Sequence, residues 1–260
     1  MSSLHHVLLL GGSGKVAQLL TPLLLQRSWN VTSIIHDPAR VEGLQKLGQG
    51  QNGKLNVLVR SLEEVTSEAQ AKTIIDEVKP DYVVWSAGAA GKGGPERTFK
   101  IDRDAAIHFI RASAATSSIT KFVMISYLGS RLQKAPWWSE EAWQECVKNN
   151  NGVLKTYYQA KIAADQVLYE EGKKRKDFAA IGLRPGLLTT EPAGKVKLGK
   201  VFESGTASRA SVAQVTALLL DSPNIKSSWL DLLDGDEDPE AAVKRNVEEG
   251  VDAAEGEPFY

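Results

Sequence analysis

The sequence has only one cysteine, Cys146, in 260 residues, and this scarcity excludes several kinds of protein. A single cysteine cannot form an internal disulfide, and it argues against a cysteine-rich metal site. His5, His6 and His108 show no ligand-like spacing with Cys146 or with each other, so we assign no metal. The chain fits a reducing compartment, and we expect a cytoplasmic protein.

The sequence also lacks long apolar runs and an excess of charge of one sign. No run approaches the roughly 20 residues of a membrane span. The first ten residues have no basic region and leave no room before Gly11 for the apolar region of a signal peptide. The formal net charge is −1, which leaves no broad basic field for nucleic acid or an anionic membrane. We therefore expect no nucleic-acid or membrane partner, and a small molecule as substrate.

What the sequence does contain is an alternation of apolar strand-like runs with segments of helical periodicity. This order predicts an α/β fold with a doubly wound parallel sheet. Strands that are apolar throughout fit a sheet covered by helices on both faces. The predicted strands are 6–10, 30–35, 55–59, 81–85, 121–126 and 178–183, and the predicted helices are 15–27, 38–47, 66–78, 101–116 and 156–173.

Two segments interrupt the alternation. Residues 131–152 form an insertion that holds three of the six tryptophans. After Pro185 the pattern loosens, with helices predicted at 211–220 and 239–250 and a strand at 229–233. We expect a main domain over residues 1–190 and a small C-terminal region over 191–260 that helps to build the substrate site and does not fold independently.

A glycine-rich turn, GGSGKVA, follows the first predicted strand. The phosphate loop of ATP-binding proteins requires G-x-x-x-x-G-K-[ST], but Leu9 and Val16 occupy the positions of the first glycine and of the hydroxyl residue. A dinucleotide-binding turn fits better, because Gly11 allows a sharp turn, Gly14 allows close approach to a pyrophosphate, and Ala17 allows tight helix packing. The turn predicts a phosphate at the helix N-terminus, with a plain strand-to-helix turn as the alternative.

The residues after the second strand bear on the choice between NAD and NADP. An acidic residue there usually accepts a hydrogen bond from the ribose 2′-hydroxyl and indicates NAD, and Asp37 is placed for it. His36 comes first after the strand, however, and Lys15 and Arg40 offer a cationic pocket for a 2′-phosphate. We favour NADP and keep NAD as the alternative. Asp37 can instead cap the helix that follows Pro38.

Tyr157 and Lys161 lie four residues apart in a predicted helix and therefore share a face. An ammonium so placed is expected to lower the pKa of the phenol, and such a phenol exchanges a proton with a carbonyl or alcohol oxygen. Ser126 ends the fifth strand, where open α/β sheets bind ligands. The alternatives are a packing tyrosine and a solvated lysine. The neighbouring Tyr158 has Ile162 at the lysine position.

Together these features resemble the atypical or extended branch of the short-chain dehydrogenase/reductase superfamily, which includes NmrA-like and epimerase/dehydratase proteins. The resemblance rests on the glycine turn, SAG after the fourth strand, FVMIS, Y-x-x-x-K and RPG, and it spans residues 7 to about 190. It implies a Rossmann-type fold, NAD(P) binding and a catalytic set of Ser126, Tyr157 and Lys161. The implied cofactor contacts are Gly11, Gly12, Ser13, Gly14, Lys15, Val16, His36, Asp37, Arg40, Leu62, Ser86, Ala87, Gly88, Tyr157, Lys161, Pro185 and Gly186.

The sequence departs from the family at two cofactor positions. His36 stands where NADP-binding members often carry arginine. The loop after the third strand reads RSL in place of an acidic adenine contact, so the backbone of Leu62 is the candidate there.

The tryptophan insertion contains PWWSEEAW, which predicts a helix with Ser139 as its N-cap. Trp137, Trp138 and Leu128 are candidate substrate contacts, as parts of a lid over an apolar or aromatic substrate. The alternative is that these aromatics pack the insertion onto the domain or onto another subunit.

The resemblance implies an NAD(P)-dependent oxidoreductase that acts on a small-molecule carbonyl or alcohol. The same residues suit an epimerase or dehydratase, and a non-catalytic NADP(H) sensor is a third possibility. We expect a monomer or a homodimer.

Overall fold

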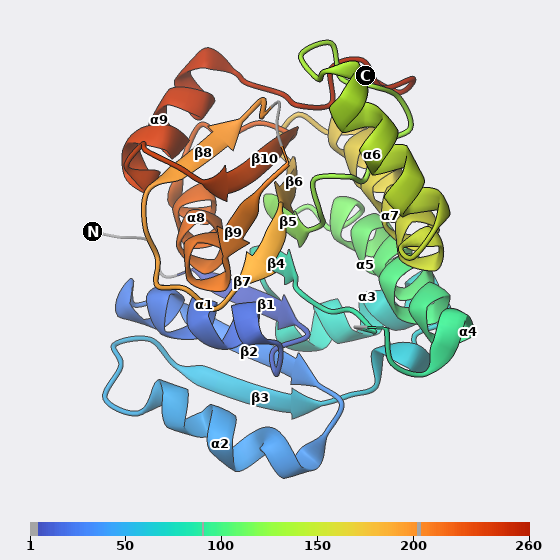
Figure 1. Cartoon of the computed structure of the whole chain (residues 1–260). Helices are drawn as coiled ribbons and strands as arrows, with labels where there is room; N and C mark the ends of the chain where they lie inside the picture. The colour runs from blue at the N-terminus through green and yellow to red at the C-terminus, as the bar shows by residue number, and fades with distance from the viewer. Residues whose placement is uncertain (1–4, 90, 202–203) are drawn as a thin grey trace.

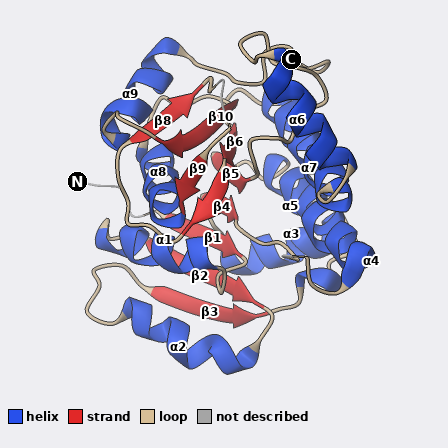
Figure 2. Cartoon of the chain, in the orientation of Figure 1, coloured by secondary structure: helices blue, strands red, loops and turns tan. Residues whose placement is uncertain are grey.

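The structure, a computed structural model, describes residues 5–89, 91–201 and 204–260. Its centre is an eight-stranded sheet in the order β3-β2-β1-β4-β5-β6-β10-β8, which Figure 2 shows as one layer between helices. Every pair of neighbours is parallel except β10 and β8, which are antiparallel. The predicted doubly wound sheet is confirmed. Its strands are β1 (His6–Leu10), β2 (Asn30–Ile35), β3 (Leu55–Val59), β4 (Tyr82–Trp85), β5 (Lys121–Ile125), β6 (Ala179–Pro185), β8 (Val196–Gly199) and β10 (Ser228–Asp234).

Helices cover both faces of the sheet (Figure 1). In β1, Val7 and Leu9 pack into one buried core while Leu8 and Leu10 pack into the other. Successive side chains of a strand point to opposite faces, so an unbroken apolar run requires a core on each side. One face carries α1 (Lys15–Gln26) and α8 (Arg209–Asp221), and the other carries α3 (Glu68–Val78), α5 (Ala106–Ala114) and α7 (Lys155–Lys174).

The helices differ from the sequence expectation in three places. The helix expected at 38–47 is divided, with only α2 (Val41–Gln45) as α-helix between two short 3₁₀ turns. The one expected at 101–116 starts earlier, at α4 (Gly94–Thr98), where Pro95 occupies the first turn, and reaches α5 through a π-helical stretch, Phe99–Ala105. α3 begins only at Glu68, because the Ser67 hydroxyl caps it by accepting from the Gln70 amide.

The described residues of 191–260 are divided between the main sheet and its surroundings. They supply β8 and β10 to the sheet and α8 to one face, and α9 (Pro239–Glu249) packs beside α8 and β8. Two strands of three residues, β7 (Leu187–Thr189) and β9 (Thr206–Ser208), pair as a small second sheet. The last residues lie next to α7, where the Tyr169 hydroxyl donates to Asp252.

No helix in the described part of the chain combines the length and the apolar character that crossing a membrane requires.

Candidate functional site

The turn after β1 has a backbone that only glycine adopts easily. Gly11 has φ +84°, and a Cβ there would lie 2.5 Å from the Cα of Ala87, which follows β4. The amides of Gly11 and Gly12 donate to the Ile34 carbonyl at 3.2 and 3.0 Å, so the turn is fixed to β2. Gly14 caps α1 without a side-chain acceptor, which leaves the first N–H groups of the helix for an anion.

A cleft of about 260 Å³ opens beside this turn, at the carboxyl ends of β1, β2 and β4. Most of the predicted cofactor contacts after these strands line it. Gly12 and Val16 face the interior and Lys15 projects into solvent, so these three do not form its wall. The predicted residues in the wall are Gly11, Ser13, Gly14, His36, Asp37, Arg40, Leu62, Ser86, Ala87 and Gly88.

The charges of the cleft bear on the ribose contact. The Asp37 carboxylate accepts from the Ala39 amide at 3.0 Å and lies 3.6 Å from Arg40 Nε, so it acts as the cap of a 3₁₀ turn. Arg40 also reaches the Ser13 carbonyl at 3.4 Å, across the mouth of the glycine turn. Three further cations line the same cleft, Arg60, Lys92 and Arg97, and the sequence analysis did not identify them.

The residues present fit a dinucleotide. The glycine turn gives close backbone approach, the free helix end gives an anion site, and cations surround the outer part of the cleft.

Ser126 follows β5 and is buried with its hydroxyl directed at Asp165 of α7. Ser130 donates to the same carboxylate oxygen at 2.6 Å. Asp165 lies one helical turn beyond Lys161, so it shares that face of α7. A carboxylate only accepts hydrogen bonds, and the Ser126 proton is therefore committed to Asp165.

Tyr157 and Lys161 lie on α7 as predicted, but their environments differ. Burial raises the pKa of Tyr157, and the nearby carboxylates of Asp102 and Asp165 raise it further. The prediction that Lys161 lowers this pKa is wrong in this structure. Lys161 is buried and its ammonium donates to the Ile125 carbonyl at 2.9 Å, so it is not in the wall of either cavity that flanks it.

Asp102 lies between the dinucleotide cleft and the tyrosine. Its carboxylate accepts from the Ala89 amide at 2.8 Å, and a Cβ at Gly88 would lie 2.8 Å from one of its oxygens. Burial raises the pKa of Asp102, while the Lys161 ammonium lowers it. Asp102 thus holds the loop after β4 through the Ala89 amide, and it is close enough to Lys161 of α7 to interact with its charge.

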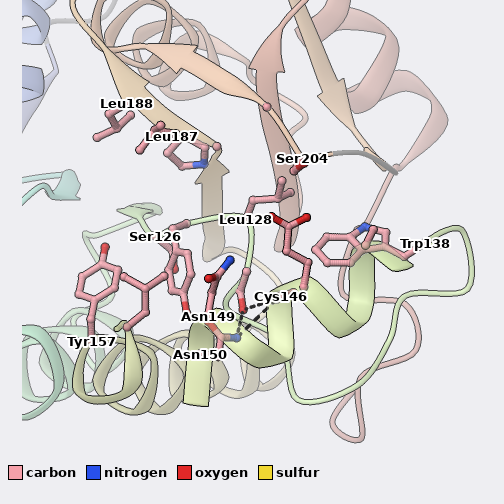
Figure 3. A pocket seen from close by; sticks show the side chains of 18 of the residues that line it. Ser126, Leu128, Trp138, Cys146, Asn149, Asn150, Tyr157, Leu187, Leu188 and Ser204 are labelled. Atoms are coloured by element: carbon pink, nitrogen blue, oxygen red, sulfur yellow. Dashed lines mark hydrogen bonds between the residues drawn. The ribbon is translucent and has the colours of Figure 1, made fainter. Parts of the chain in front are cut away.

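A second cavity, of about 490 Å³, lies at the carboxyl ends of β5 and β6. Figure 3 shows Tyr157 and Ser126 at one end of it and Trp138 at the other, with Leu187 and Leu188 above the tyrosine. Its wall is largely apolar. It includes the predicted residues Ser126, Leu128, Trp138, Tyr157, Pro185 and Gly186, together with Tyr127, Cys146, Asn149, Asn150, Leu154, Ser204 and Arg209.

The tryptophan insertion forms α6 (Glu140–Asn151), which begins at the Ser139 cap as predicted. Trp137 and Trp138 both donate their indole N–H to the Val201 carbonyl, at 2.9 and 2.7 Å. Trp138 lines the cavity, whereas Trp137 packs outside it with its ring 5.4 Å from the Arg131 guanidinium. The insertion is therefore both packed onto the domain and part of the cavity wall.

Two fully buried arginines fix the loop between β5 and α6. Arg184 donates to the carbonyls of Leu128 and Ser130 at 2.6 and 2.9 Å, and its Nε lies 3.0 Å from Asp231. Arg131 donates to the Ala253 carbonyl at 2.8 Å. The C-terminal segment thereby holds the loop that carries Leu128 into the cavity.

Sequence reasoning missed Asp102, Asp165 and Arg209. Only Asp165 had a local signal, because it follows Lys161 by four residues. The other two reach the site through contacts between segments far apart in the sequence.

Known proteins resemble the chain over most of its length. A family model described as NAD(P)H-binding matches residues 11–223. A UPF0659 protein of Schizosaccharomyces pombe is 34% identical over 229 residues, which cover 86% of this chain and 88% of that protein. The uncharacterized sugar epimerase YhfK of Bacillus subtilis is 29% identical over 241 residues, covering 92% of this chain and 99% of that protein.

Solved structures of other proteins share the fold of this chain. A candidate NAD-dependent epimerase/dehydratase of Bacillus halodurans has a TM-score of 0.73 at 25% identity, covering 93% of this chain and 99% of that one. The anaerobillin reductase ChuY of Escherichia coli O157:H7 shares the fold, with a TM-score of 0.65 at 20% identity over 90% of this chain and 99% of that one. The resemblance to atypical short-chain dehydrogenases/reductases is confirmed, and the chain belongs to the NAD(P)H-binding family.

Proposed function

We propose that the protein is an NAD(P)-dependent oxidoreductase that interconverts a carbonyl and an alcohol, with Tyr157 as the group that exchanges the proton. The observation that carries this proposal is the position of Tyr157 and Ser126 in the wall of an apolar cavity at the end of β5. The neighbouring strand, β4, ends at the dinucleotide cleft. NAD(P)H supplies a hydride when it is bound, and the chain must supply the proton.

Tyr157 is suited to act first as an acid. Because its pKa is raised, the phenol keeps its proton at neutral pH and can donate it to the carbonyl oxygen of a substrate as the alcohol forms. In the reverse direction the phenol must first lose that proton, so alcohol oxidation requires a more alkaline solution.

Ser126 acts as a hydrogen-bond acceptor in this proposal. Its proton is committed to Asp165, so the oxygen presents lone pairs to the cavity and accepts from a substrate hydroxyl. Asp165 is then a positioning residue. The Lys161 ammonium donates a hydrogen bond to the Ile125 carbonyl. This hydrogen bond fixes the backbone directly before Ser126.

We propose NADP as the preferred cofactor. Asp37, the residue that would accept from a 2′-hydroxyl, is engaged by the Ala39 amide and by Arg40. Arg40 and Arg60 line the cleft beyond β2, where an added phosphate would find charge-assisted hydrogen bonds.

The test begins with titrations of the purified protein with NADPH and NADH, read by cofactor fluorescence and melting temperature. We expect NADPH to bind more tightly. A panel of carbonyl compounds is then screened for NADPH consumption, with Tyr157→Phe as the control. We expect this variant to bind NADPH normally and to lose about 10²- to 10⁴-fold in turnover. Failure of both cofactors to bind would overturn the proposal.

A second candidate is an epimerase or dehydratase, in which the hydride returns to the substrate. It is favoured by the names of two similar proteins, the uncharacterized sugar epimerase of Bacillus subtilis and the NAD-dependent epimerase/dehydratase candidate of Bacillus halodurans. This activity would convert sugar substrates without net NADPH consumption and would also require Tyr157. Tight cofactor binding with no turnover of either the carbonyl compounds or the sugars would instead indicate a sensor.

A further inference from the structure

The substrate cavity contains two charged side chains among its described lining residues, Glu145 and Arg209. The rest of its wall is made mostly of leucines, aromatic rings, glycines and uncharged polar groups. In an apolar environment a single charge influences binding strongly, because the local dielectric is lower than that of water. The placement of these two charges therefore bears directly on the class of ligand.

Arg209 is the first residue of α8, directly after the edge strand β9. It is half-buried, and its guanidinium donates to the Thr189 carbonyl at 2.8 Å. Among the residues that the structure describes, no carboxylate lies within ion-pair distance of it. The two fully buried arginines differ, since Arg184 pairs with Asp231 at 3.0 Å and Arg131 with Glu257 at 3.3 Å. Arg209 therefore retains N–H donors for a ligand.

Glu145 does not neutralise Arg209. It lies on α6 and is exposed to solvent, whereas Arg209 is half-buried. Solvent and salt screen an exposed carboxylate more than a partly buried guanidinium. Among the described residues of the cavity wall, Arg209 is therefore the one charged side chain that is partly buried.

The remaining wall defines the body of the ligand. Leu128, Leu154, Leu187 and Leu188 line the cavity with Trp138, and its volume of about 490 Å³ suits a molecule of one or two rings. Tyr157 and Ser126 line the same space, at the end away from Trp138. A ligand that fills the cavity contacts both the proton-exchanging tyrosine and the guanidinium.

We propose that the substrate is an aromatic or otherwise apolar carbonyl compound that carries an anionic group, a carboxylate or a group of like charge, which Arg209 binds. This inference rests on the proposed function for the position of the carbonyl at Tyr157. Arg209 is a specificity-determining residue: it selects the anionic substrate over a neutral analogue of the same shape.

The experiment compares two fluorescent probes of similar shape, the anion 1-anilinonaphthalene-8-sulfonate and the neutral N-phenyl-1-naphthylamine. We expect the Arg209→Gln variant to bind the anion about tenfold more weakly and the neutral probe within about twofold of wild type. Arg209→Lys keeps the charge and should retain most of the affinity for the anion. Leu128→Trp, which narrows the cavity, should weaken both probes.

A second measurement uses the wild-type protein and does not depend on how a variant folds. Raising the salt from about 50 mM to about 500 mM should weaken the anionic probe and leave the neutral probe unchanged. The substrate proposal is overturned if wild type fails to bind the anionic probe, if Arg209→Gln leaves its affinity unchanged, or if both probes weaken equally.

NADPH affinity separates this proposal from the proposed function. If Arg209→Gln loses NADPH affinity and keeps the anionic probe, Arg209 holds the cofactor, and only the substrate proposal fails. If wild type does not bind NADPH, the proposed function fails, whatever the probes show. If Arg209→Gln loses affinity for the anionic probe alone and keeps its NADPH affinity, both the proposed function and the substrate proposal are supported.

Discussion

The dinucleotide cleft and the substrate cavity lie at the same edge of one sheet but are built differently. The cleft is lined mainly by turns that directly follow β1, β2, β3 and β4, and its mouth is charged. The cavity gathers residues 126–129, 138–157, 185–188 and 204–209, and its wall is mostly apolar. The proposed cofactor site therefore depends on local backbone geometry, whereas the proposed substrate site depends on how distant segments pack.

The sharpest way to break this comparison is to disable the cleft alone. Gly11→Val places a β-branched side chain at φ +84° and against the Ala87 backbone. We expect strain of about 3 kcal/mol in the turn, and NADPH affinity about 100-fold lower in a fluorescence titration. The anionic probe should still bind the cavity, which shows that the variant is folded.

Gly43→Ala is the matched control, because Gly43 lies in α2, an added Cβ there would meet no atom within 4 Å, and its φ is not positive. It should bind NADPH like wild type. Normal NADPH binding by Gly11→Val would show that the glycine turn does not hold the dinucleotide.

The two directions of the reaction should respond differently to pH. Tyr157 has a raised pKa, so its protonated form persists well above neutrality. We expect carbonyl reduction to be nearly constant between about pH 6 and pH 9 and alcohol oxidation to rise about tenfold per pH unit in that range. Initial rates in both directions measure this. Oxidation that levels off near neutral pH would mean that Lys161 lowers the pKa when substrate and cofactor are present.

A change at Asp165 tests whether activity depends on this α7 carboxylate to position the Ser126 hydroxyl. In Asp165→Asn, the amide replaces an acceptor of two serine hydrogen bonds and introduces N–H donors beside them. We expect turnover to fall about tenfold with NADPH affinity unchanged. Asp76→Asn, an exposed change on α3, is the control. A loss of NADPH affinity with normal turnover would contradict this role.

The smallest expected effect concerns the exposed edge of the cleft. Arg40→Ala should weaken NADPH about fivefold and leave NADH unchanged, because the Arg40 side chain is exposed and screened. Lys15→Ala is the matched control, since Lys15 is exposed and is not among the residues that line the cleft. Equal loss of NADPH and NADH affinity would show that Arg40 binds the pyrophosphate that both cofactors share. A larger loss of NADPH affinity in Lys15→Ala than in Arg40→Ala would show that Lys15, and not Arg40, binds the 2′-phosphate.

Much of the fold followed from the sequence because its signals are local. Largely apolar runs predicted β1 to β6, because most positions of these strands pack under helices. The strands β7, β8 and β9 were missed, because three or four residues give too short a pattern.

The sequence by itself determined the parallel sheet, the glycine turn and the position of Tyr157 and Lys161 on one helical face. These depend on backbone sterics and on periodicity within a few residues. Tertiary structure alone decided that Asp102 lies near the tyrosine, that Ser126 and Ser130 donate to Asp165, and that Arg209 lines the cavity. It also reversed the expected direction of the Tyr157 pKa, because burial, the carboxylate of Asp102 on another element and that of Asp165 on the same helix all raise this pKa.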